Sequence, residues 1–254
     1  AIDLDAGGDI TTQSLYSYSN SPRGNPGDGG DIALHAVSGI TIQSTIASNS
    51  YSHHNDSENA GAISLTTISG DITIQNHLYA NSKSKHGDTG GGGTISIQAG
   101  GNITTTKKIL HSISQSEKGN SGNGGDISLK AGQNILTGAI LAGTVAEEGN
   151  SGDGGDISLK AGGNIIAEDF LSSNSKSGNS GNGGAIDLVA GGDITTQNLD
   201  SRSHSDLGNT GNGGAIDLVA GGDIKTEDLY SSSHSISGNS GNGGAIDLVA
   251  GGDI

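Results

Sequence analysis

The chain repeats short runs in which apolar or small residues alternate with polar ones. At positions 186–190, Ile-Asp-Leu-Val-Ala places isoleucine, leucine and alanine at every second residue. A period of two puts such side chains on one face of a β-strand. A second run follows a Gly-Gly pair, and the same period points Ile194 and Thr196 inward. Each of these runs has the length of one short strand.

A third run begins at Leu199, whose parity is opposite to that of the second run, so the chain must bend near Gln197. Serine then occupies every second position as far as Ser205. The alternate positions carry charged and aromatic residues, which belong in water. We therefore expect the serines to face inward, because a slip of one residue would bury aspartate and arginine. The buried hydroxyls must then bond to one another or to the backbone.

These runs belong to one repeat. The segment from Gly178 to Ile194 returns unchanged from Gly238 to Ile254, and the period is 29 to 32 residues throughout. The first isoleucines of the units are Ile2, Ile32, Ile63, Ile95, Ile127, Ile157, Ile186, Ile216 and Ile246. We interpret residues 1–254 as a single repeat domain of eight full coils and a partial ninth. The chain begins and ends at the same phase of the repeat, so we expect it to be a window of a longer chain.

The pattern predicts an all-β fold, a parallel β-solenoid with three strands per coil of about 30 residues. No helical periodicity runs through the units, and one unit alone cannot bury its apolar face. Parallel crossovers are overwhelmingly right-handed, so a right-handed coil is expected. The core residues that matter most are Ile186, Leu188, Ala190, Ile194, Leu199, Ile216, Leu218, Ile224, Leu229, Ile246 and Leu248.

Composition narrows the possible partners. Asp and Glu number 27 against 11 Lys and Arg, for a formal net charge of −16, which disfavours nucleic acid as a partner. There is no cysteine, so disulfides and thiol chemistry are absent. No apolar run is long enough to span a membrane.

The repeat reads Gly-Asn-Gly-Gly-x-Ile-x-Leu-x-Ala-Gly-Gly-x-Ile-x-Thr, followed by x-Leu and a serine-rich run. This resembles the repeats of large haemagglutinin-like exoproteins of cyanobacteria and other Gram-negative bacteria, which are similar to the filamentous haemagglutinin family of two-partner secretion. The unit here is longer than the short coil of filamentous haemagglutinin. The resemblance implies an extracellular location at the bacterial cell surface and a role as stalk or filament.

The glycine loops, such as Gly149 to Gly155, allow two interpretations: corners that need positive φ, or cation sites. A phosphate loop would need a following helix, which the pattern lacks. Asp187, Asp217 and Asp247 form an outward column in the last units, where a bound Ca²⁺ would relieve the repulsion between like charges. Splayed side chains and salt would relieve it too. No cofactor is expected, and these aspartates are the weak candidates for a metal site.

Histidines offer a second candidate for metal binding. His204 and His234 share an outward column, and His53 and His54 are adjacent. No third ligand recurs beside them in the sequence, so surface histidines are the favoured interpretation. No unit carries a distinctive catalytic cluster, so we expect no enzyme activity, with a polysaccharide lyase as the alternative.

Two outward columns suggest surfaces. Val189, Val219 and Val249 would form a small apolar stripe that another chain could cover. Threonines at 11–12, 104–106 and 195–196 hint at a flat ice-binding face, which Ile166, Ala167 and Lys225 interrupt.

The main hypothesis is a structural rod of a surface exoprotein that serves adhesion, a filament or a matrix fibre, with self-association into filaments or bundles. The alternative is a module that binds carbohydrate or cell-surface glycans through the variable outer face of the serine wall. A rod depends only on the residues of the core and the glycine loops, whereas a glycan-binding module also requires a recognition surface.

Overall fold

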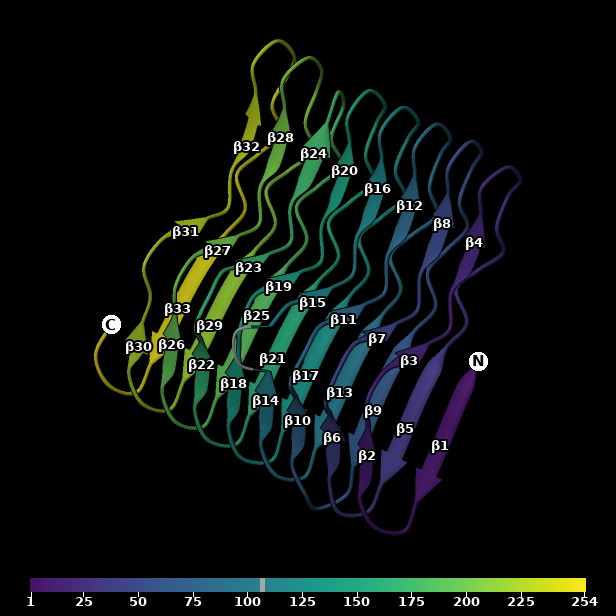
Figure 1. Cartoon of the computed structure of the whole chain (residues 1–254). Coiled ribbons are helices and arrows are strands. Elements are labelled where there is room, and N and C mark those ends of the chain that lie inside the picture. Colours follow the sequence, from purple (N-terminus) through teal and green to yellow (C-terminus); the bar gives the residue numbers. More distant parts are fainter. Residues whose placement is uncertain (106–107) are drawn as a thin grey trace.

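The computed structural model describes residues 1–105 and 108–254. They form an all-β parallel solenoid of about eight turns with about 30 residues per coil, and the described residues contain no helix. The N- and C-termini lie at opposite ends of the stack (Figure 1). The predicted fold class is confirmed, and the described part of the chain is a repeat rod.

Sheet A is built from the Ile-x-Leu-x-Ala runs, which pair in parallel and in register, as Ile186 does with Ile216. Its strands are β1 (Ile2–Ala6), β5 (Ile32–Ala36), β9 (Ile63–Thr67), β13 (Ile95–Ala99), β17 (Ile127–Ala131), β21 (Ile157–Ala161), β25 (Ile186–Ala190), β29 (Ile216–Ala220) and β33 (Ile246–Ala250).

Sheet B is built from the runs that follow the Gly-Gly pair. Its strands are β2 (Ile10–Thr12), β6 (Ile40–Ile42), β10 (Ile72–Ile74), β14 (Ile103–Thr105), β18 (Ile135–Thr137), β22 (Ile165–Ala167), β26 (Ile194–Thr196) and β30 (Ile224–Lys225). In β26, Ile194 and Thr196 are buried and Thr195 is exposed, as the parity predicts.

Sheets C and D come from the third predicted run. Sheet C contains β3 (Leu15–Tyr16), β7 (Ile46–Ala47), β11 (Leu78–Tyr79), β15 (Leu110–His111), β19 (Ile140–Leu141), β23 (Leu171–Ser172), β27 (Leu199–Asp200) and β31 (Leu229–Tyr230). Sheet D contains β4 (Ser19–Ser21), β8 (Ser50–Ser52), β12 (Ser82–Ser84), β16 (Ser114–Ser116), β20 (Thr144–Ala146), β24 (Ser175–Ser177), β28 (Ser203–Ser205) and β32 (Ser233–Ser235).

The described coils therefore contribute to four sheets, where the sequence predicts three strands per coil. The division between β27 and β28 occurs at Ser201. Its N–H donates to the carbonyl of Tyr230 in the next coil at 2.8 Å, but its own carbonyl accepts from the N–H of Gly214 in the same coil at 2.8 Å. That carbonyl turns away from the ladder between coils, so the run breaks into two strands.

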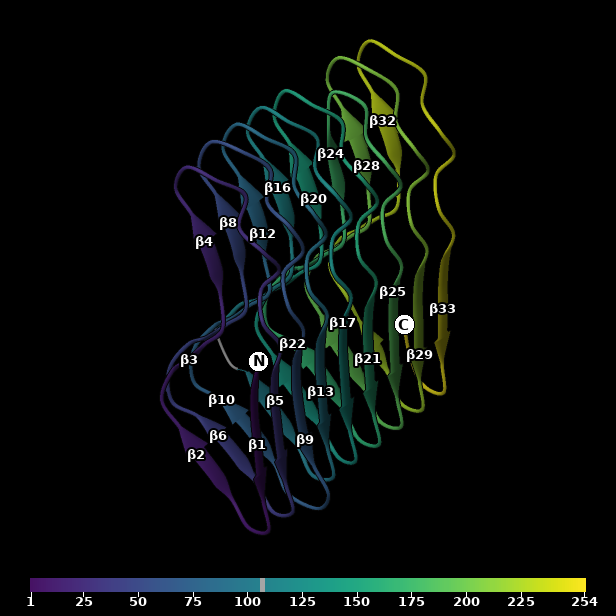
Figure 2. The same ribbon diagram turned by 90° about the vertical axis from the view of Figure 1, so that its right-hand side faces the viewer.

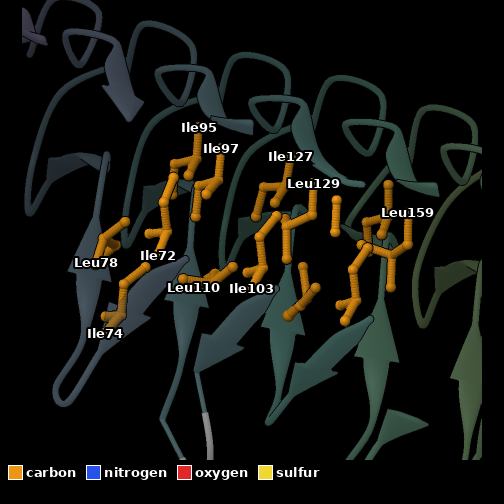
Figure 3. Packing of buried hydrophobic residues seen from close by; sticks show 14 of the residues in the cluster. Ile72, Ile74, Leu78, Ile95, Ile97, Ile103, Leu110, Ile127, Leu129 and Leu159 are labelled. Carbon is orange, nitrogen blue, oxygen red and sulfur yellow. The ribbon is translucent and has the colours of Figure 1, made fainter. Parts of the chain in front are cut away.

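The apolar core lies between sheets A, B and C and continues from coil to coil (Figure 3). Eight of the eleven predicted core residues are buried, at 4% exposure or less. Leu229 and Leu248 are partly buried against the core, and Ile246 is 42% exposed because β33 pairs with a neighbour on one side only. The inward parity of all three is nevertheless that of their partners in register.

Sheet D packs against the glycine-rich segment that returns the chain to the next strand of sheet A, as the narrow upper lobe in Figure 2 shows. Away from the two end coils the serines of this wall are buried, and their hydroxyls donate to glycine carbonyls, as Ser114 does to Gly90 at 2.8 Å. Other hydroxyls pair with one another, as in Ser151 and Ser175 at 2.8 Å. The prediction of a thin serine-lined wall with mutually bonded hydroxyls is confirmed.

The glycine loops are explained by close stacking. None of the glycines in the described glycine loops, such as those from Gly149 to Gly155, has a φ between +20° and +160°, so the predicted need for positive φ at these corners is wrong. A Cβ added to Gly122 would instead lie 2.8 Å from the backbone carbon of Gly90 in the preceding coil. Coils spaced about 4.8 Å apart leave no room for a side chain that points along the axis of the stack.

Asparagine and aspartate side chains form ladders along the turns. Each Oδ1 accepts a hydrogen bond from the backbone N–H of the equivalent residue one coil on, as Asn134 does from Asn164 at 2.8 Å. The same bond joins Asn182 to Asn212 at 2.8 Å in the glycine segment. These side chains satisfy backbone donors that lie outside the strands, and so extend the stacking order into the turns.

Candidate functional site

The outer face of sheet A carries two of the sequence candidates. Asp187, Asp217 and Asp247 stack in register, and Asp187 forms an ion pair with Lys160, whose Nζ lies 3.4 Å from the carboxylate. Within residues 1–105 and 108–254, the three carboxylates are not brought together within 4.8 Å of one another. A Ca²⁺ ion held by these aspartates therefore stays an untested prediction.

The valine stripe lies on the same face. Val189, Val219 and Val249 are in register, with Val219 41% and Val249 58% exposed. In the preceding coil the position is Lys160. The stripe is thus confined to the last three coils of the chain, where it forms a small apolar surface.

The outer face of sheets C and D gathers aromatic residues. All five tyrosines of the chain lie on these strands or in the bend between them: Tyr16, Tyr18, Tyr51, Tyr79 and Tyr230. One hollow of about 300 Å³ in this face is lined by Tyr51, Tyr79 and Lys83, together with asparagine amides.

A second hollow in the same face, of about 290 Å³, is lined by Lys176, Arg202 and His204. The Arg202 guanidinium is held by Asp200 at 2.8 Å and lies 4.7 Å from the ring centroid of Tyr230. Aromatic rings, amides and cations that converge on a concave surface are chemically suited to bind a polar ligand of negative charge.

His111 also belongs to this face, but its ring is largely buried. Burial lowers its pKa to about 4, with further contributions from Lys83 and His77. Its Nδ1 has no hydrogen-bond partner among the described residues. The ring is therefore neutral at pH 7 and resists protonation.

The predicted pair His204 and His234 is stacked, with ring centroids 5.4 Å apart and planes at 14°. The Nε2 of His204 lies 2.9 Å from Oδ1 of Asp206. No third potential ligand among the described residues joins these two rings within 4.8 Å.

The other histidine pair gains a partner that sequence reasoning missed. His53 and His54 lie in the turn after β8, and His86 lies in the turn after β12, one coil on. The ligand atoms of the three imidazoles all lie within 4.8 Å of one another. Both His54 and His86 stand two residues after the last serine of their strands, so in-register stacking of β8 and β12 superimposes them. That shared position is the signal that would have found the cluster.

The threonine columns are regular only in part. Thr41 pairs in register with Thr11 and Thr73 on the outer face of sheet B, and Thr73 with Thr104, but Leu136 follows in the next coil. Thr106 lies outside the described residues. The threonine face that the ice-binding hypothesis requires therefore extends over only four of the described coils.

A comparison of the chain with protein-family models, with curated proteins and with solved structures found no match to any of them. None of the described residues forms a helix with the length and apolarity needed to cross a membrane.

Proposed function

We propose that this chain is a structural rod of an extracellular surface protein, in which it forms a stalk, filament or matrix fibre that serves adhesion. The observation that carries the proposal is the uniformity of the stack. All four sheets repeat in register from coil to coil, and the turns repeat with them through the asparagine and aspartate ladders.

A rod of this kind has a defined length and stiffness. The nine strands of sheet A are separated by eight spacings of about 4.8 Å, which gives about 38 Å from first to last. Each coil is tied to the next by strand ladders on four walls, so bending the rod requires many hydrogen bonds to be distorted together. Such an element sets the distance between whatever lies at its two ends.

The solvent-exposed valines support self-association as part of this function. Rods that pack side by side would cover Val219 and Val249, and a weak contact repeated along many coils gains strength through multivalency. The haemagglutinin-like character of the repeat and the absence of cysteine both fit a bacterial cell-surface location.

Immunogold electron microscopy of intact source cells, with antibodies raised against the folded rod, tests the proposal. The expected result is label on thin fibres outside the cell. Label confined to the cell interior would overturn it.

A second candidate function is favoured by the aromatic face of sheets C and D. Tyr51, Tyr79 and Lys83 line a hollow large enough for a sugar ring, and cations recur in the second hollow of the same face. This arrangement supports binding of an acidic glycan. A glycan array probed with the isolated chain distinguishes the two functions. If the chain binds an acidic glycan through this hollow, Tyr79→Ala and Lys83→Ala should each abolish the binding.

A further inference from the structure

The turns that carry the three histidines are held in fixed positions. The hydroxyl of Ser52 accepts a hydrogen bond from the N–H of Asn55 at 3.0 Å, and the hydroxyl of Ser84 accepts one from the N–H of Gly87 at 2.9 Å. Both turns therefore have the same local structure, in which a serine closes the loop three residues on. The imidazoles project from two copies of one anchored turn.

The two turns also lie in direct contact. A Cβ on Gly87 would lie 2.5 Å from the backbone nitrogen of Asp56, so glycine is what allows the turn of His86 to approach the preceding coil. The rings of His54 and His86 are stacked with centroids 5.5 Å apart and planes at 7°. The ring of His53 lies 4.4 Å from that of His54 and 5.8 Å from that of His86.

The Nδ1 atom of His53 is buried and makes no hydrogen bond to any described residue. Buried polar atoms normally have a partner, so this unpaired ring nitrogen is available to a partner from outside the chain.

From this geometry we propose that His53, His54 and His86 form a binding site for a divalent transition-metal ion, and that the ion is Zn²⁺. Imidazole nitrogen suits zinc, and three protein ligands with a water molecule make a common tetrahedral site. Bonds of about 2.0–2.1 Å place the nitrogens of such a site about 3.4 Å apart. The ligand atoms, already within 4.8 Å, reach that spacing by small side-chain rotations, and His54 and His86 are exposed and free to make them.

Charge around the site acts in both directions. Lys85 lies in the position of His53 one coil on and repels a cation, whereas Glu117, one further coil on, attracts it. Lys85 is not a metal ligand, but its positive charge opposes the cation. We therefore expect Lys85→Gln to strengthen metal binding a few-fold. The rod itself does not depend on the metal, because the turns are closed by serine hydroxyls without it.

Isothermal titration of the untagged chain with ZnCl₂ at neutral pH tests the proposal, with Co²⁺ absorption as a report of tetrahedral nitrogen coordination. We expect one equivalent to bind, His86→Asn and His53→Asn each to weaken binding at least tenfold, and Lys85→Gln to strengthen it. His204→Asn is the matched control, because it alters a stacked pair that lacks a third imidazole, and it should leave the affinity unchanged.

Absence of binding by the original chain would overturn the proposal. So would equal affinity in His86→Asn, or an equal loss in His204→Asn, since either result shows that zinc binds to scattered surface histidines. Circular dichroism of each variant separates loss of the site from loss of the fold.

Discussion

Replacing Ile127 and Ser128 in turn by aspartate tests which face of sheet A is the core. The same side chain is introduced at adjacent positions of β17, one fully buried and one exposed. Ile127 lies between Ile95 and Ile157 in the stack, and Ser128 lies between Ser96 and Ser158, with no charged residue directly beside it in register. The two variants differ in burial and little else.

The cost at Ile127 has two parts. Truncation of a buried isoleucine costs about 2–5 kcal/mol. Keeping the new carboxyl group neutral at pH 7, against an ordinary pKa of about 3.9, costs about 4 kcal/mol more. The sum of about 6–9 kcal/mol is comparable to the whole stability of a typical domain, about 5–15 kcal/mol. Ser128→Asp should change stability by no more than about 0.5 kcal/mol.

Thermal and urea unfolding followed by circular dichroism measures the difference, and hydrogen exchange shows whether the loss is confined to the coils around β17, as expected for a stack of nearest-neighbour contacts. The buried carboxyl has a raised pKa, so the folded state binds more protons than the unfolded state. The deficit of Ile127→Asp relative to the original chain should therefore shrink as the pH falls from 7 towards 4. Equal melting of the two variants would refute the assignment of the faces.

Further predictions concern the other walls. Gly122→Ala should destabilise the rod by at least about 2 kcal/mol in chemical unfolding, because its Cβ would meet backbone that cannot yield, whereas Gly8→Ala, with nothing within 4 Å, should be close to neutral. Ser114→Ala should cost about 1–3 kcal/mol, because it removes the donor to the half-buried carbonyl of Gly90 and the bond to the Thr89 hydroxyl, and Gln115→Ala on the outer face should not. The lowered pKa of His111, about 4 against 6.5, means that the unfolded state binds the proton first, so about 3 kcal/mol of stability should be lost as the pH falls from 6.5 to 4. Urea titrations at a series of pH values measure the free energy of unfolding, and in His111→Gln the decrease of about 3 kcal/mol between pH 6.5 and 4 that is due to His111 should be absent.

The sequence specifies the solenoid because alternation and period are visible in it. The parity of Ile194 and Thr196 and the inward serines follow from the cost of burying charge, and the structure confirms them. Leu171 rather than Phe170 fills the core in its unit, and because both residues are apolar, hydrophobicity alone does not distinguish them.

Other features depend on contacts between distant residues. The split of the third run arises where the carbonyl of Ser201 bonds across the coil to Gly214, which no local pattern encodes. The glycines look like corner residues in sequence, but their role appears only when the preceding coil is placed against them. The third histidine of the metal site is likewise supplied by the adjacent coil, 32 residues along the chain from His54.

Electron paramagnetic resonance distances between spin labels test the central claim, that the chain is a stiff rod of coils stacked in register. The chain has no cysteine, so labels can be placed freely on the outer column of sheet A. With one label at Ala33, a second at Ser158, Asp187 or Asp217 lies four, five or six coils away. We expect narrow distributions centred near about 19, 24 and 29 Å, rising by about 4.8 Å for each coil. Broad distributions, or distances that do not rise in proportion to the number of coils, would contradict the rod.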